Sequence, residues 1–109
     1  MSETSEIIAL AVVEALDDKD EECLQLLHEF YAMLQRKQYS RDLLYRDAED
    51  SRRLVNIRYW RSAEARKEAH EDPEVHGFWK RLSEISKVTL VFERLEDVTP
   101  QDSMDKGQG

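Results

Sequence analysis

The segment Ile7 to Ala15 (IIALAVVEA) constrains the fold more than any other part of the sequence, because it is almost continuously apolar. A run this short and this rich in β-branched residues is typical of a strand that is covered on both faces. The sequence therefore predicts a central strand in a sheet that has a covering layer on each side.

The next segment has the pattern of an amphipathic helix that ends near Arg36. Asp17 and Asp18 are candidate N-caps, and the acidic residues 20–22 favour the positive end of the helix dipole. One apolar stripe at helical spacing follows, made of Leu24, Leu27, Phe30, Tyr31 and Leu34.

Two alternating segments, Tyr39 to Arg46 and Arg53 to Trp60, are joined by the polar residues 47–51 and predict an antiparallel hairpin. Since side chains alternate along a strand, the second segment presents two different faces. One face carries Val55, Ile57 and Tyr59, and the other carries Leu54, Asn56, Arg58 and Trp60.

A helix that is broken at Pro73 follows the hairpin. Ser62 can cap a first part from Ala63 to about His70, and Asp72 can cap a second part that begins at Pro73. The last strand is predicted over Lys87 to Leu95. The element order is then β-α-β-β-α-β, which predicts an α+β ferredoxin-like domain with a four-stranded antiparallel sheet and both helical segments on one face.

Composition and length limit the class of protein. The chain has 109 residues, with 16 basic and 24 acidic side chains and a net charge of −8. One domain over residues 7–98 is expected, between flexible polar tails at 1–6 and 99–109. The acidic balance argues against a nucleic-acid partner, and no apolar run is long enough for a membrane span. The acidic N-terminus does not have the pattern of a signal peptide, so a cytoplasmic location is expected.

The residues around the hairpin's end resemble those of a known family. The segment Tyr59 to Ala65 (YWRSAEA), with His70, Pro73, Phe78 and Leu82 further along, resembles the antibiotic biosynthesis monooxygenase family. The resemblance implies a homodimer in which two sheets face each other as a dimeric α/β barrel. Such a partner would cover the second face of the strand Ile7 to Ala15.

Some members of that family are quinone-forming monooxygenases that use no metal and no flavin. They carry an Asn and a Trp four residues apart on the third strand, a spacing that Asn56 and Trp60 match. Lys80 stands where that pattern has an Arg, whereas Arg66 departs from the pattern because it stands where a Tyr is expected.

The resemblance thus implies a cofactor-independent monooxygenase, without cofactor or metal, that acts on a small aromatic or quinone-like compound. The amide of Asn56 and the indole of Trp60 would bind a developing oxyanion. His70 would move protons, with a pKa raised by its neighbours Glu71 and Asp72. The candidate catalytic residues are Asn56, Trp60 and His70, and the candidate substrate-binding residues are Arg58, Trp79 and Lys80.

Three alternatives stand beside this prediction. The chain could be a non-catalytic dimeric module that binds a ligand or responds to stress. Trp60 could be a core aromatic residue, with Asn56 a polar residue on a wet face. A haem-degrading branch of the same fold is disfavoured, since the strand Ile7 to Ala15 has no Asn and Ala69 stands where a Trp is expected. The single cysteine, Cys23, allows no intrachain disulfide, and we interpret it as structural.

Overall fold

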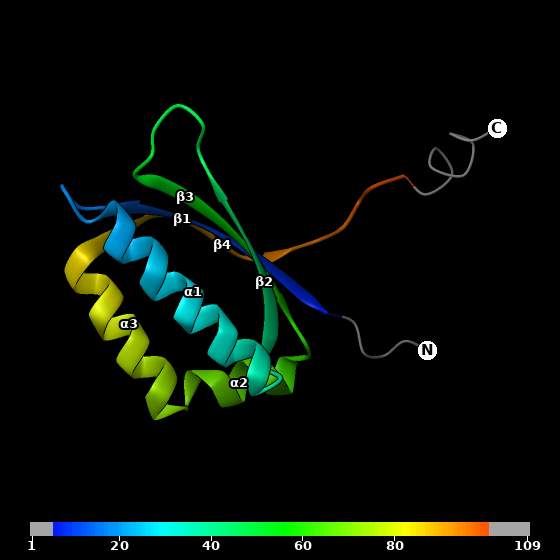
Figure 1. Ribbon diagram of the computed structural model, residues 1–109. Helices are drawn as coiled ribbons and strands as arrows, with labels where there is room; N and C mark the ends of the chain where they lie inside the picture. Colours follow the sequence, from blue (N-terminus) through cyan, green and yellow to red (C-terminus); the bar gives the residue numbers. More distant parts are fainter. Residues whose placement is uncertain (1–5, 101–109) are drawn as a thin grey trace.

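The computed structural model describes residues 6–100 and contains the predicted order of elements. Figure 1 shows them in sequence: β1 (Ile7–Ala15), α1 (Asp20–Arg36), β2 (Ser40–Arg46), β3 (Arg53–Trp60), α2 (Ala63–His70), α3 (Pro73–Ile85) and β4 (Ser86–Leu95). Most of the two predicted tails, residues 1–5 and 101–109, lies outside the described residues, so their flexibility stays a prediction.

The four strands form one antiparallel sheet in the order β2-β3-β1-β4. The α+β ferredoxin-like fold is therefore confirmed. β1 lies inside the sheet and pairs with β3 on one side and β4 on the other, a position that fits its almost continuously apolar sequence. Its register places Ala9 opposite Arg58 and Ala11 opposite Asn56. Two small side chains on the central strand thus stand beside two large polar ones on β3.

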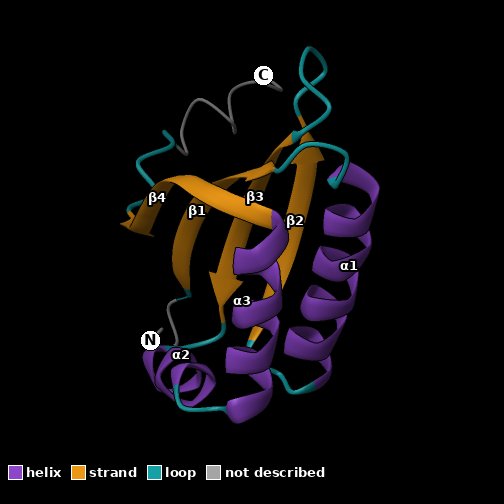
Figure 2. Cartoon of the chain, turned by 90° about the vertical axis from the view of Figure 1, so that its left-hand side faces the viewer, coloured by secondary structure: helices purple, strands orange, loops and turns teal. Residues whose placement is uncertain are grey.

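All three helices lie on one face of the sheet, as predicted (Figure 2). α1 and α3 run side by side across that face, and α2 lies across one end of the strands. The core between the two layers is made of two clusters of buried side chains. One contains Phe30, Leu34, Trp60 and Phe78, and the other contains Cys23, Leu27, Leu54 and Ile85.

The beginning of α1 differs from the sequence prediction. The N-cap is Lys19, and its side chain makes no capping hydrogen bond. Asp18 adopts a left-handed turn with φ 64°, and the carboxylate of Asp17 binds Arg52 at 2.8 Å instead. The prediction that one of these aspartates caps α1 is wrong, because the left-handed turn at Asp18 precedes the helix and Lys19 occupies the N-cap position. The acidic first turn still favours the helix dipole.

The apolar stripe of α1 is also shifted from the predicted one. Met33 is buried in the core although the predicted stripe omitted it, while Leu24 is only partly buried. Packing against α3 as well as the sheet widens the buried face of α1 beyond a single line of residues.

The break between α2 and α3 was predicted correctly. The Ser62 hydroxyl accepts a hydrogen bond from the Ala65 amide at 3.0 Å, and one Asp72 oxygen accepts from the Glu74 amide at 2.8 Å. The other Asp72 oxygen accepts from Lys37 at 2.8 Å and from the Tyr39 hydroxyl at 2.6 Å. Asp72 thereby ties the break to the connection between α1 and β2.

The second face of the sheet is apolar and carries no helix within residues 6–100 (Figure 1). Tyr45 and Phe92 are 55% and 47% exposed there, and Leu43 and Leu90 are also exposed. The predicted dimer would cover this face, and it remains a prediction. No helix in the described part of the chain is long and apolar enough to cross a membrane.

Candidate functional site

A cleft of about 250 Å³ lies between the sheet and the helices, at the end covered by α2. The small side chains of Ala9 and Ala11 leave this space open beside the large residues of β3. The lining comes from β1, β3, β4, α2 and α3, namely Ala9, Leu10, Ala11, Asn56, Arg58, Trp60, Arg66, His70, Trp79, Val88, Val91 and Glu93.

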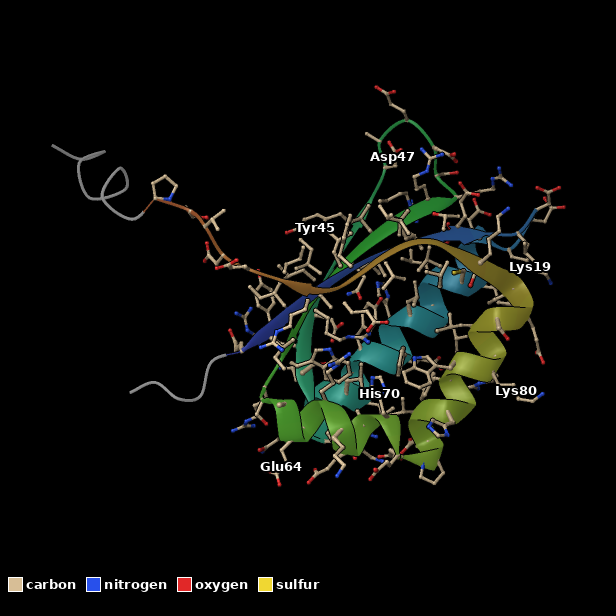
Figure 3. The ribbon with its side chains drawn as sticks, turned by 180° about the vertical axis from the view of Figure 1, so that it is seen from behind. Lys19, Tyr45, Asp47, Glu64, His70 and Lys80 are labelled. Carbon is tan, nitrogen blue, oxygen red and sulfur yellow. The ribbon has the colours of Figure 1, made fainter. Side chains whose placement is uncertain are left out.

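All but one of the candidate site residues predicted from the sequence line this cleft, namely Asn56, Arg58, Trp60, His70 and Trp79. The exception is Lys80, whose side chain is 77% exposed and lies 3.6 Å from Glu84. Figure 3 shows Lys80 pointing away from the molecule, whereas His70 lies among the side chains between α2 and the sheet. Successive helical residues point about 100° apart, so Lys80 faces solvent because Trp79 faces the cleft.

One wall of the cleft is aromatic. The ring of His70 lies 5.8 Å from the ring of Trp60 and meets Trp79 edge-on at 5.4 Å. The ring of His76 stacks on Trp79 at 5.6 Å, and its Nε2 atom donates a hydrogen bond to the carbonyl oxygen of His70. These contacts hold the wall in one arrangement, with flat surfaces suited to a planar ligand.

His70 behaves differently from the sequence expectation. Its pKa is lowered from the usual 6.5, first because its ring is partly withdrawn from water and next because Arg66 is close. The predicted increase from Glu71 and Asp72 is wrong, since the Asp72 carboxylate is turned away toward Lys37 and Tyr39. The imidazole is therefore neutral at pH 7 and can accept a proton.

Asp42 on β2 supports the floor of the cleft, and sequence reasoning missed it. Its carboxylate is fully buried and accepts three hydrogen bonds: from Ser40 at 2.8 Å, Asn56 at 3.0 Å and Arg58 at 2.6 Å. The alternation along β2 puts Asp42 on the face shared with Ser40. Only the register between β2 and β3 places it opposite Arg58.

This arrangement changes the role expected for Asn56. One nitrogen of its amide, Nδ2, donates to Asp42 and also to the carbonyl oxygen of Leu43 at 3.1 Å. Because an amide nitrogen has two hydrogens, Asn56 has no N–H group left to donate to a substrate oxyanion. Asn56 supports Asp42 instead.

A second cleft, of about 430 Å³, adjoins the first and shares Trp79 and Val88 with it. Its remaining walls are largely apolar and include Val13, Leu27 and Leu82. Trp79 thus lies between two clefts, of which the first contains the charged side chains of Arg58, Arg66 and Glu93.

Metal-ligand and thiol chemistry find little support within residues 6–100. No group of three or more His, Cys, Asp or Glu side chains in that range is arranged to hold a metal ion. Cys23 is fully buried in the core, and burial raises its pKa, so a reactive thiolate is disfavoured.

No protein-family profile matches the sequence, and no curated protein matches it either. The fold, however, is similar to several solved structures. A protein from Bacteroides thetaiotaomicron, provisionally named an antibiotic biosynthesis monooxygenase, superposes with a TM-score of 0.74 at 12% identity, covering 88% of this chain and 92% of that one. The cofactor-independent oxygenase SnoaB from Streptomyces nogalater gives 0.70 at 16% identity, covering 88% and 100%.

A provisionally named antibiotic biosynthesis monooxygenase from Deinococcus radiodurans gives 0.69 at 16% identity, covering 86% and 97%. The resemblance stated from the sequence is thus confirmed at the level of fold. At identities this low the likeness concerns the fold alone, so arguments about the reaction depend on the residues of this chain.

Proposed function

We propose that the chain is a cofactor-independent monooxygenase that converts a small phenolic compound into a quinone in the cleft beside Trp60. The observation that carries the proposal is the aromatic wall of Trp60, His70 and Trp79, which includes a histidine that is neutral at pH 7. SnoaB, which has a similar fold, is named a cofactor-independent oxygenase, and the proposal takes up that class of reaction.

The size and walls of the cleft favour a small planar ligand. A space of about 250 Å³ is slightly smaller than typical ligand sites, which span roughly 300–1,000 Å³. Stacking against indole rings stabilises an aromatic ring by about 0.5–1.5 kcal/mol beyond the burial of its area. A compound of one or two fused rings fits this description.

The proposed reaction needs only the substrate and dioxygen. His70 accepts the phenolic proton, and the phenolate supplies the electrons that reduce dioxygen. One oxygen atom enters the ring para to the hydroxyl group. The other leaves as water with the two hydrogens that the substrate loses, so no external reductant is consumed.

We propose further that two copies close across the open face of the sheet. Monomers rarely expose a continuous apolar patch of more than a few hundred Å², and Tyr45, Leu90 and Phe92 share this face. Light scattering is expected to return twice the chain mass of 12.9 kDa. A monomer mass at micromolar concentration would contradict the dimer.

A second candidate function is a ligand-binding module without catalysis. Two observations favour it: both Asn56 N–H groups are already used, and Arg66 stands where the resembling oxygenases carry a Tyr. The module would bind the same aromatic ligands without consuming oxygen.

Oxygen uptake separates the two candidates. Chelator-treated protein, checked for flavin by its absorbance, is mixed with 1-naphthol in an oxygen electrode. The enzyme is expected to consume one dioxygen for each 1,4-naphthoquinone formed, and His70→Gln is expected to lower the rate by about 10²–10⁴-fold. His28→Gln is the matched control, because His28 is exposed on α1 away from the cleft. Binding of 1-naphthol without oxygen uptake would favour the module.

A further inference from the structure

The guanidinium group of Arg58 has hydrogen-bond donors that the described protein does not use. Arg58 donates through Nε to Asp42, and this is the one hydrogen bond that it makes with residues 6–100. In the same range no buried side-chain nitrogen or oxygen lacks a partner, so the two terminal nitrogens, Nη1 and Nη2, are not buried. Arg58 lines the cleft, and both of these nitrogens keep accessible surface.

Several contacts fix the orientation of this guanidinium. Asp42 holds Nε at 2.6 Å, and the Arg58 side chain is only 13% exposed. The central carbon of the guanidinium lies 5.1 Å from the Trp60 ring, 5.4 Å from Phe30 and 5.5 Å from Tyr31. Cation–π contacts at such distances are attractive. Arg58 is therefore held in place before any ligand arrives.

The Asp42 carboxylate is not placed to repel a ligand anion in the cleft. It is fully buried and does not line the cleft, so a ligand oxygen there meets the N–H groups of Arg58 and not the carboxylate. Ser40 and Asn56 share the stabilisation of the Asp42 charge.

A second cation strengthens the positive character of the cleft. Arg66 also lines it, and its partner Glu93, at 3.2 Å, is 74% exposed. An ion pair this exposed is weak, so Arg66 can exchange Glu93 for a ligand anion. Both Arg66 and Arg58 lower the pKa of His70, which indicates that the two cations act on the same space. The cleft is thus locally basic in a chain of net charge −8.

We infer that the cleft selects aromatic compounds that carry a planar anionic oxygen group, such as a carboxylate, and that Arg58 is the residue that recognises it. The planar fork of arginine matches two oxygens at once, and such charge-assisted hydrogen bonds are roughly twice as strong as neutral ones. This inference rests on the proposed function, since it assumes that the cleft binds an aromatic ring.

The test compares two compounds that differ only in charge, 3-hydroxy-2-naphthoate and 3-hydroxy-2-naphthamide. Equilibrium dialysis gives each affinity, and the emission of tryptophan reports the place of binding. The chain has two tryptophans, Trp60 and Trp79, and both line the cleft. The parent is expected to bind the acid about tenfold more tightly than the amide, which corresponds to about 1.4 kcal/mol, and to change its emission with both.

The variant that removes the selection is the double substitution Asp42→Asn with Arg58→Gln. Changing both partners avoids leaving one buried charge without its counterpart, which would destabilise the fold. The double variant is expected to lose most of the tenfold preference, because only Arg66 then remains to attract the anion, and to keep the parent's affinity for the amide. Asp17→Asn with Arg52→Gln is the matched control: it removes an ion pair of 2.8 Å outside the cleft and is expected to keep the tenfold preference.

Salt dependence gives a second measurement that needs no variant. Raising NaCl from about 0.01 M to about 1 M shortens the Debye length from about 30 Å to about 3 Å. The preference for the acid is expected to fall while the affinity for the amide stays constant. A preference that does not change with salt, or one that the double variant retains, would overturn the inference.

The outcomes also separate this inference from the proposed function. If the parent binds acid and amide equally and its tryptophan emission changes, the selection for an anion is refuted. The proposal that the cleft binds aromatic compounds is then still supported. If neither compound binds or alters the emission, the proposal that the cleft binds aromatic compounds is wrong, and the inference about Arg58 is wrong with it.

Discussion

Asp42 on β2 and Arg58 on β3 lie directly opposite each other in the sheet, with 2.6 Å between Oδ2 of Asp42 and Nε of Arg58. The pair is nearly dry, since the aspartate side chain is fully buried and the arginine is 13% exposed. Strand register thus sets the chemistry of the cleft: a slip of β2 by one residue would move Asp42 to the open face and leave Arg58 without its partner.

The first prediction concerns the stability of this pair. Asp42→Ala is expected to lower the free energy of unfolding by about 3–5 kcal/mol, because it leaves a buried guanidinium without its partner. The double variant Asp42→Asn with Arg58→Gln is expected to lose much less. Urea unfolding of the single and double variants measures the coupling, and additive losses would show that the two side chains do not depend on each other.

The second prediction concerns Trp79, which lines both the cleft that contains Arg58 and the adjoining second cleft. Trp79→Ala is expected to join the two spaces and to improve the binding of 2-anthracenecarboxylate relative to 2-naphthoate. The reason is that the third ring can then reach the apolar walls formed by Leu27 and Leu82. Equilibrium dialysis of both compounds measures the ratio. An unchanged ratio in a folded variant would mean that Trp79 is not the barrier.

The third prediction follows from Asp72. Hydrogen bonds from Lys37 and Tyr39 lower its pKa from the usual 3.8 to about 2. Because the pKa is depressed in the folded state, this carboxylate contributes stability that is present above about pH 4 and is lost as the pH falls toward 2. Asp72→Asn is expected to have a lower Tm than the parent at pH 6 and to approach it at pH 2.

The control for that experiment is Asp17→Asn, which removes an exposed carboxylate of α1's entry turn. Because an ion pair this exposed contributes little to stability, its Tm at pH 6 is expected to stay close to the parent's. A constant difference between Asp72→Asn and the parent from pH 6 to pH 2 would contradict the proposed contacts of Asp72.

The fourth prediction concerns His70. Because its pKa is lowered by burial and by Arg66, NMR titration of its imidazole is expected to give a midpoint below 6.5. Arg66→Gln is expected to move the midpoint upward, since it removes a nearby positive charge. If His70 is the base, kcat/KM rises with pH through the same midpoint. A midpoint above 6.5 in the parent would contradict the environment described for His70.

The sequence predicted what local signals determine. The caps Ser62 and Asp72, together with Pro73, mark the break in the second helix, and alternation along β3 put Asn56, Arg58 and Trp60 on one face. These signals depend only on neighbouring residues along the chain, so they can be predicted without knowing the tertiary contacts.

The parts that sequence reasoning missed depend on long-range contacts. Asp42 meets Arg58 through the register of two strands, and the pKa of His70 depends on partial burial and on Arg66 rather than on the adjacent carboxylates. Lys80 was placed by resemblance, yet the phase of α3 turns it to solvent. All three features depend on how strands and helices pack against one another, and a local sequence pattern does not contain that information.

Labelling with ¹⁸O₂ tests the central claim most directly. Chelator-treated, flavin-free protein is incubated with 1-naphthol under ¹⁸O₂, and the quinone and the water are analysed by mass spectrometry. A monooxygenase that works through the cleft is expected to place one labelled atom in each quinone and one in water, with turnover strongly reduced in His70→Gln and unchanged in His28→Gln. Quinone without the label, or equal turnover in all three proteins, would contradict the account.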